Sequence, residues 1–212
     1  MPLTLHQLLS PKGELGLWEI KEDEKWFRDR LDLSTTESDQ LKKIKGHKRL
    51  EWLAARMLIH SMSGRDKRGF FIKDEFGKPY LTGSPFNISI SHSRKYAAAI
   101  AAPESVGIDI QSFVPKIERI THKFMSKAES DMLDSKFRLW HLHIYWSAKE
   151  ALYKAYGRRK LNFCEHIIIK PFEYQKQAGQ FFGEIIKDKE HFKYQLDYKL
   201  YKDYVLVYAK EM

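Results

Sequence analysis

The sequence predicts an α+β protein built from two halves, each with helices packed on a small antiparallel sheet. Residues 42–62 repeat apolar side chains at the three- and four-residue spacing of a helix that buries one face. Residues 86–91 alternate apolar with polar side chains, as a half-buried strand does. Residues 194–198 alternate in the same way, which is typical of an antiparallel sheet with one wet face.

The two predicted halves meet near residues 103–106. We therefore assign residues 1–104 to an N-terminal half and residues 105–212 to a C-terminal half. A chain of 212 residues with 43% hydrophobic content is long and apolar enough to bury a core. No internal sequence repeat relates the two halves.

Composition and charge limit the possible partners. The 37 basic residues exceed the 28 acidic ones and give a net charge of +9, which favours nucleic acid, a phosphorylated small molecule or an acidic protein. The single cysteine, Cys164, excludes an intramolecular disulfide and is interpreted as a small buried or half-buried thiol rather than a nucleophile. Residues 1–6 lack the form of a signal peptide and no run of 18 apolar residues occurs, so we expect a cytoplasmic protein without a membrane partner.

In the N-terminal half, the first expected strand is 16–20, and polar helical segments follow at 22–33 and 36–43. The helix at 42–62 carries basic side chains beside its apolar face, a pattern that most often marks a solvated surface. The residues of this helix that we expect in the core are Leu50, Leu53, Ala54, Met57, Leu58 and Met62.

A short strand and a turn-rich loop with Gly and Pro occupy residues 70–80. The strand at 86–91 is expected to pair with a more buried neighbour at 96–102. Ser91 and His92 suggest a serine hydrolase, but adjacent residues on a strand point to opposite faces and cannot form the nucleophile–base contact.

A buried strand is predicted at 106–111, where Asp109 stands among Val and Ile residues. A buried carboxylate is costly unless it is paired or bound to a cation. Gly107 is also unfavourable in a strand, which indicates that something approaches the backbone closely there.

A helix is predicted from residue 137 onward, and Gly157 is expected to end it. Within its last part, 146–157, Ser147 is a possible cap near the start. Glu150 and Lys154 lie together on one side. They form either an exposed surface ion pair or part of a site. The apolar stripe on the other side consists of Ala148, Leu152 and Ala155.

Ahead of this helix, Ser126 and Glu129 have the spacing of a capping box. His141 and His143 do not face each other at a two-residue spacing on a helix, so we interpret them as structural. The aromatic residues of the tail suit core or cross-strand packing better than base stacking. The strands expected in the tail are 167–170, 180–186, 194–200 and 204–208.

The two carboxylates, Asp109 and Glu150, are 41 residues apart in the sequence. Together they would offer the oxygen ligands that Mg²⁺ prefers, with substrate phosphates and water completing the shell. Lys149 and Lys154 would then contact phosphate beside the metal.

Several motifs in the sequence resemble those of a known protein family. A Gly-Ile-Asp strand at 107–109, followed by Trp-Ser-Ala-Lys-Glu-Ala-Leu-Tyr-Lys at 146–154, resembles the signature pair of the 4′-phosphopantetheinyl transferases. Gly-Lys-Pro at 77–79, Phe-Asn at 86–87 and Ser-His-Ser at 91–93 are similar to the remaining motifs of that family. The resemblance implies the Sfp-type fold, in which one chain forms two pseudo-symmetric α+β halves, and the chain length favours a monomer.

The activity that the resemblance implies is that of a holo-[acyl-carrier-protein] synthase. The phosphopantetheine arm of coenzyme A would move to a serine of an apo acyl or peptidyl carrier protein, and adenosine 3′,5′-bisphosphate would be released. The carrier proteins are acidic, which suits the charge of +9. The implied cofactor is Mg²⁺, with Mn²⁺ as the alternative.

The resemblance also implies a role for individual residues. Asp109 and Glu150 would hold the metal, Glu150 would act as base, and Lys154 would stabilise charge on the phosphates. Gln111 stands where many members of the family have a second acid, so it would reach the metal as a neutral ligand or through a water molecule. The implied coenzyme A contacts are Arg49, Arg56, Lys78, Ser91, His92, Lys149 and Lys154.

Two other functions stay open from the residues alone. A metal-dependent nuclease also combines carboxylates with a lysine, although its Glu-x-Lys usually lies on a strand, whereas Glu150 and Lys154 are spaced for a helix. A basic nucleic-acid-binding module explains the charge but leaves Asp109 and Glu150 without a purpose.

Overall fold

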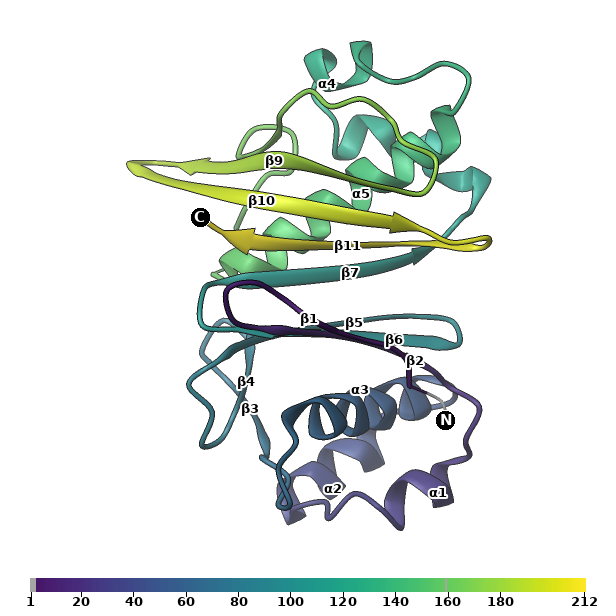
Figure 1. Ribbon diagram of the computed structural model, residues 1–212, viewed down its shortest axis with the longest axis vertical. Helices are drawn as coiled ribbons and strands as arrows, with labels where there is room; N and C mark the ends of the chain where they lie inside the picture. The colour runs from purple at the N-terminus through teal and green to yellow at the C-terminus, as the bar shows by residue number, and fades with distance from the viewer. Residues whose placement is uncertain (1–2, 159) are drawn as a thin grey trace. The chain divides into compact units, whose positions relative to one another are not determined.

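The computed structural model describes residues 3–158 and 160–212. The predicted α+β class is confirmed: the chain combines antiparallel sheets with packed helices (Figure 1). It divides into two compact units, Met1–Pro103 and Glu104–Met212. In the described part of the chain, no helix combines the length and the apolar character needed to cross a membrane.

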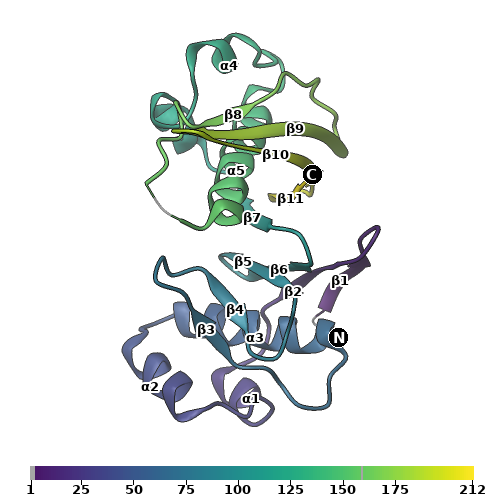
Figure 2. The same ribbon diagram turned by 90° about the vertical axis from the view of Figure 1, so that its left-hand side faces the viewer.

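The first unit contains a four-stranded antiparallel sheet, whose strand order is β1-β2-β6-β5. Three helices lie on one face of this sheet, and a separate two-stranded hairpin, β3–β4, follows the third helix (Figures 1 and 2). The strands are β1 (Leu3–Leu8), β2 (Glu14–Glu19), β3 (Phe71–Lys73), β4 (Pro79–Leu81), β5 (Asn87–Ser93) and β6 (Tyr96–Ala102), and the helices are α1 (Glu24–Arg28), α2 (Thr35–Lys43) and α3 (Lys48–Ser63).

The helix expected at 42–62 begins only at Lys48, because residues 42 and 43 belong to the end of α2. Gly46 has a φ of 60°, a conformation that most residues disfavour, and it lies between α2 and α3. From Lys48 onward the predicted apolar stripe holds: Leu53, Ala54 and Leu58 are fully buried against the sheet. The strand β1 was not predicted, and it is an edge strand with mostly exposed side chains.

The second unit is a five-stranded antiparallel sheet of order β7-β11-β10-β9-β8. The helix α5 runs across one face of this sheet (Figures 1 and 2). The strands are β7 (Val106–Ser112), β8 (Ile167–Ile169), β9 (Ala178–Lys187), β10 (Glu190–Leu200) and β11 (Tyr204–Glu211), and the helices are the 3₁₀ segment η1 (Pro115–Lys123), α4 (Lys127–Asp131) and α5 (Arg138–Tyr156).

The contact between α5 and β7 explains Gly107. A Cβ atom at this position would lie 1.8 Å from the carbonyl oxygen of Ala151, because the backbone of α5 packs directly on β7. The expected close approach at Gly107 is therefore confirmed, and the approaching group is the helix. This contact brings the middle of β7 next to the α5 residues that follow Trp146.

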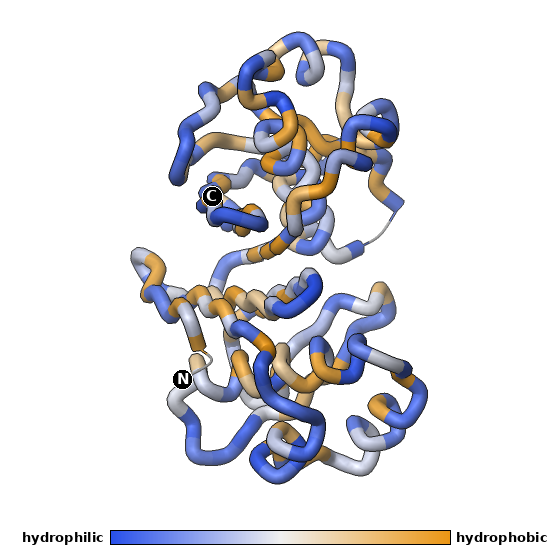
Figure 3. Tube along the Cα trace, turned by 90° about the vertical axis from the view of Figure 1, so that its right-hand side faces the viewer, coloured by the Kyte–Doolittle hydropathy of each residue, from blue (hydrophilic) through white to orange (hydrophobic). Residues whose placement is uncertain are grey.

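Hydrophobic and hydrophilic residues alternate along much of the trace in both units (Figure 3). Most residues of α5 are buried. Gly157 ends α5 in the left-handed conformation with a φ of 72°, as predicted. The prediction that Ser147 is a cap was wrong: α5 begins at Arg138, and Ser147 is fully buried in the middle of it. The capping box of Ser126 and Glu129 at α4 is confirmed.

Candidate functional site

Asp109 lies in the middle of β7 and is almost entirely buried. The ammonium group of Lys154, on the last turn of α5, donates to its Oδ1 atom at 2.8 Å. The same nitrogen donates to the carbonyl oxygen of Ile108 at 2.9 Å. The strand aspartate and the helix lysine predicted as site residues are therefore in direct contact.

Glu150 lies one helical turn before Lys154 and is half-buried. Burial raises the pKa of its carboxyl group, the negative charge of Asp109 raises it further, and Lys154 opposes both effects. Because the charge of Asp109 acts on Glu150, the two carboxyl groups belong to one electrostatic site. The arrangement leaves Glu150 readier than an exposed glutamate to hold a proton.

Gln111 is two residues after Asp109 on β7, so both side chains leave the same face of the strand. Gln111 is half-buried and pairs with Val205 of β11, whereas Asp109 pairs with Val207. In residues 3–158 and 160–212, no cluster of three or more His, Cys, Asp or Glu side chains suited to a metal is present. The groups that could bind a metal here are the carboxylates of Asp109 and Glu150 and the amide oxygen of Gln111.

Lys149 is placed differently from the expectation. Its side chain is 0% exposed, and its Nζ atom donates to Glu129 Oε2 and to the carbonyl oxygens of Phe163 and Ile167, each at 2.8 Å. Burial lowers the pKa of this lysine, and the charge of Glu129 counteracts that effect. A lysine enclosed by three acceptors is not available to a phosphate, so the predicted ligand contact of Lys149 is corrected to an internal ion pair.

Arg49, at the start of α3, is the first of the predicted ligand contacts in the other unit. It donates from Nε and Nη2 to the carboxylate of Glu24 at 2.7 Å and 2.5 Å, and from Nη1 to the carbonyl oxygens of Leu41 and Ile44. This pairing lowers the pKa of Glu24 to about 2. Arg49 remains partly exposed, and a phosphate there would share its guanidinium with Glu24.

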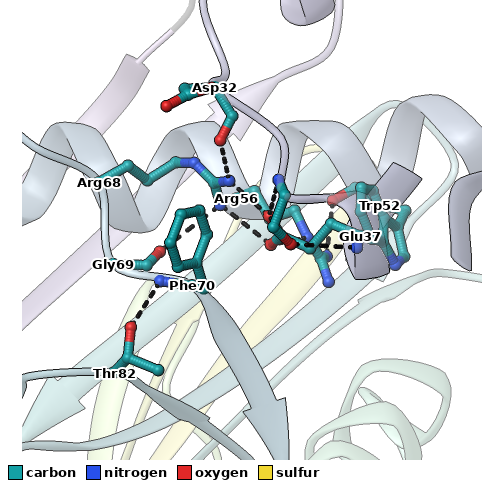
Figure 4. A network of polar contacts seen from close by, with 9 residues as sticks. Asp32, Glu37, Trp52, Arg56, Arg68, Gly69, Phe70 and Thr82 are labelled. Atoms are coloured by element: carbon teal, nitrogen blue, oxygen red, sulfur yellow. Dashed lines mark hydrogen bonds and ion pairs between the residues drawn. The ribbon is translucent and has the colours of Figure 1, made fainter. Parts of the chain in front are cut away.

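Arg56 is buried, in contrast to the expectation that it binds a phosphate. Arg56 and Arg68 converge on the carboxylate of Glu37, and the Arg56 guanidinium lies 3.1 Å from the ring centroid of Trp52 (Figure 4). Its side chain is 5% exposed, and burial lowers its pKa to about 10. Arg56 therefore ties α3 to α2 rather than facing a ligand, and Arg68 joins the segment before β3 to the same carboxylate.

Lys78, Ser91 and His92 complete the predicted ligand contacts of this unit. Lys78 lies in the turn between β3 and β4, where its backbone N–H donates to Asp74 Oδ1 at 2.8 Å. Ser91 is buried on β5, whereas the next residue, His92, is 47% exposed and lies 3.0 Å from Glu51 through Nδ1. The opposite orientation of Ser91 and His92 agrees with the argument against a Ser–His pair.

The sequence analysis missed the acidic partners of the basic residues. Glu24, Glu37 and Glu51 bind Arg49, Arg56 and His92, and Glu129 binds Lys149. Glu37 and Glu129 carry a signal that can be found in the sequence, because each is the third residue after a Ser in a capping box. Glu24 and Glu51 carry no comparable signal.

Comparison with known proteins finds a match to a protein family. The family model of the 4′-phosphopantetheinyl transferase superfamily matches residues 105–209, which run from the start of β7 to near the end of β11. The match includes Asp109, Gln111, Glu150 and Lys154. No curated protein matches the chain.

Proposed function

We propose that this chain transfers the 4′-phosphopantetheine group of coenzyme A to a serine of an apo acyl or peptidyl carrier protein and releases adenosine 3′,5′-bisphosphate. The observation that carries the proposal is the contact of Asp109 with Lys154 one turn after Glu150, inside the segment that matches the family. The reaction is a phosphoryl transfer, which requires stabilisation of charge on phosphate and a base for the incoming hydroxyl.

Asp109, Glu150 and Gln111 would hold Mg²⁺ in this proposal. The donors fit, because Mg²⁺ takes hard oxygen ligands and commonly uses one or two carboxylates together with substrate phosphates. A bound Mg²⁺ would supply charge neutralisation at the diphosphate of coenzyme A. The amide of Gln111 brings no charge, so we expect weaker metal binding than a third carboxylate would give.

Lys154 is the cation that this chain itself directs at the site. Its hydrogen bonds to Asp109 and Ile108 fix the position of the ammonium group at the end of α5. A fixed positive group costs no reorganisation during the reaction and can stabilise charge on the diphosphate oxygens. We assign this role to Lys154.

Glu150 is the proposed base for the serine hydroxyl. A pKa raised by burial and by Asp109 moves the carboxyl group closer to neutral pH, where a general base works well. Trp146, one turn earlier on α5, packs edge-on against Phe124 with ring centroids 5.1 Å apart, which holds this part of the helix in place.

In the N-terminal half, 1–104, we propose that Arg49, Lys78, Ser91 and His92 contact coenzyme A. The C-terminal half, 105–212, would supply the metal ligands and the catalytic helix. Arg56 and Lys149 would support these residues from inside the fold. The remaining elements of the proposal are the Sfp-type subfamily, a monomer and a cytoplasmic location.

The experiment incubates an apo carrier protein with this protein, coenzyme A and Mg²⁺ and follows the carrier by mass spectrometry. We expect a gain of one phosphopantetheine mass, lost with EDTA and with Glu150→Gln, and unchanged with the exposed control Glu173→Gln. Folded protein that modifies none of several carrier classes would overturn the proposal. Cleavage of plasmid DNA that depends on Mg²⁺ and Glu150 would instead favour the nuclease.

A further inference from the structure

A cavity of about 330 Å³ lies in the first unit, where α3 ends above the sheet. Its walls include Ile59 and Met62 of α3, Ile88 of β5, and Leu81 and Phe86 on either side of the loop that leads into β5. Its volume is at the lower end of the range of small-molecule pockets, which are mostly apolar with a few convergent polar groups.

This cavity is separate from the residues proposed to contact coenzyme A. Ile59 is ten residues after Arg49 on α3, which corresponds to about 15 Å along the helix axis. Ile88 is four residues before His92 on β5, which corresponds to about 13 Å along the strand. A molecule in the cavity would therefore occupy a different end of the sheet.

Arg65 gives the cavity a cationic group. Its Nη2 atom donates to the carbonyl oxygen of Gly83 at 2.7 Å, which fixes the guanidinium beside the cavity. In the part of the chain that the structure describes, no carboxylate forms an ion pair with Arg65. An arginine that is held in place without an acidic partner is suited to bind an anion in its fork.

The other charged groups near the cavity are Glu14 and Lys12. Glu14 lines the cavity, and its carboxylate lies 2.8 Å from His6 Nε2, so a protonated His6 would neutralise it. Lys12 is close as well, with its ammonium group 5.6 Å from the ring centroid of Phe86. The C-terminal end of α3 near Ser63 carries partial negative charge and disfavours an anion. An anion in the cavity would therefore contact the guanidinium of Arg65 rather than the end of the helix.

We propose that this cavity binds an amphipathic carboxylate, with an aliphatic tail against the apolar walls and the carboxylate on Arg65. The tail gains free energy by leaving water, and the head pairs with a cation that has no other acidic partner. A medium-chain fatty acid is the ligand class that combines these two features at this volume.

The test is a titration of the full-length protein with decanoate below its micelle concentration, followed by calorimetry. We expect saturable binding of one decanoate, weakened at least tenfold by Arg65→Gln and unchanged by the control Lys67→Gln, which removes the same charge from an exposed site two residues away. Ser84→Phe places a large ring at a residue that lines the cavity, and we expect it to abolish binding while the circular dichroism spectrum is kept.

Two further ligands separate the contributions of tail and head. Decanol has the tail without the charge and is expected to bind at least tenfold more weakly, and acetate has the charge without the tail and is expected not to bind. The assignment would be overturned if decanol bound as tightly as decanoate. It would also be overturned if neither Arg65→Gln nor Ser84→Phe changed the affinity for decanoate. Absence of decanoate binding to the folded protein would overturn it as well.

Discussion

At the scale of single residues, Lys154 connects the two motifs of the candidate site. Its ammonium group donates to Asp109 on β7 from the end of α5. An amphipathic helix alone would place it at the surface, where such a pair contributes little. The contact with an almost buried carboxylate gives this lysine a fixed position.

Replacement of Lys154 by Gln is expected to lower the rate of phosphopantetheine transfer by about 100-fold, because a fixed charge near the phosphates is lost. Steady-state kinetics with an apo carrier protein checks this expectation. Lys193→Gln, an exposed lysine of β10, serves as the control and should leave the rate unchanged. A rate within twofold of the unmodified protein for Lys154→Gln would contradict the assigned role.

His143 predicts a dependence of stability on pH. It is fully buried on α5, and burial lowers its pKa, while its hydrogen bond with the Leu139 carbonyl opposes that shift. Between about pH 6.5 and its lowered pKa, His143 is neutral in the folded protein but protonated in the unfolded chain. Its contribution to the free energy of unfolding is therefore complete above about pH 6.5 and is lost as the pH falls toward the lowered pKa. The limiting slope for one such group is about 1.4 kcal/mol per pH unit.

Urea unfolding between pH 7.5 and pH 5 measures this slope. His143→Gln should make the decline of the unfolding free energy on acidification shallower, although His141, whose pKa is also lowered by burial, keeps part of it. The exposed His122→Gln is the control and should leave the decline as it is. Equal slopes in the protein and in His143→Gln would refute the assignment.

At the scale of elements, α5 is held by contacts on more than one side. Glu129 accepts from Lys149 through Oε2 and from the backbone N–H of Ile169 through Oε1 at 3.0 Å. The carboxylate thus joins the start of α4, the middle of α5 and the strand β8. This network lies directly beside Glu150 in the sequence and fixes the rotation of the helix that carries it.

Lys149→Met is expected to lower the free energy of unfolding by about 3–5 kcal/mol, because Glu129 is left as a buried charge without its partner. The double variant Lys149→Met with Glu129→Gln should cost less than the sum of the two single changes, since it removes both charges. Chemical denaturation of all three variants measures this coupling. Additive losses would show that the pair does not act as one unit.

Gly107→Ala tests the contact of α5 with β7. The new Cβ atom would meet the carbonyl oxygen of Ala151, so the helix has to move away, and we expect a loss of about 3 kcal/mol together with weaker transferase activity. Gly46→Ala is the matched control: it has a positive φ but open space, and it should cost only about 1 kcal/mol. Similar losses in thermal unfolding would mean that packing at Gly107 is unimportant.

At the scale of the whole molecule, the net charge of +9 favours an acidic partner. If the partner is an acidic carrier protein, its KM should rise roughly fivefold between about 50 mM and 300 mM salt, because screening weakens the attraction. The kcat at saturating carrier is expected to change little. A KM that is independent of salt would contradict a role of the overall charge in partner binding.

The sequence by itself determined the features that depend on near neighbours. The α+β class, the strands β5 and β6, the capping box of Ser126 and the stop at Gly157 follow from periodicity and local backbone preference. The motif pair also identified Asp109 and Lys154, which the fold brings into contact. The cost of a buried carboxylate made Asp109 conspicuous in the sequence.

Only the tertiary structure decided which charged residues face inward. Lys149 and Arg56 look like surface cations in their helices, yet both are buried against glutamates that are 20 and 19 residues away. The edge strand β1 depends likewise on pairing with β2 rather than on its own side chains. Burial and ion pairing are decided by segments that are distant in the sequence, and periodicity within one helix or strand carries no information about them.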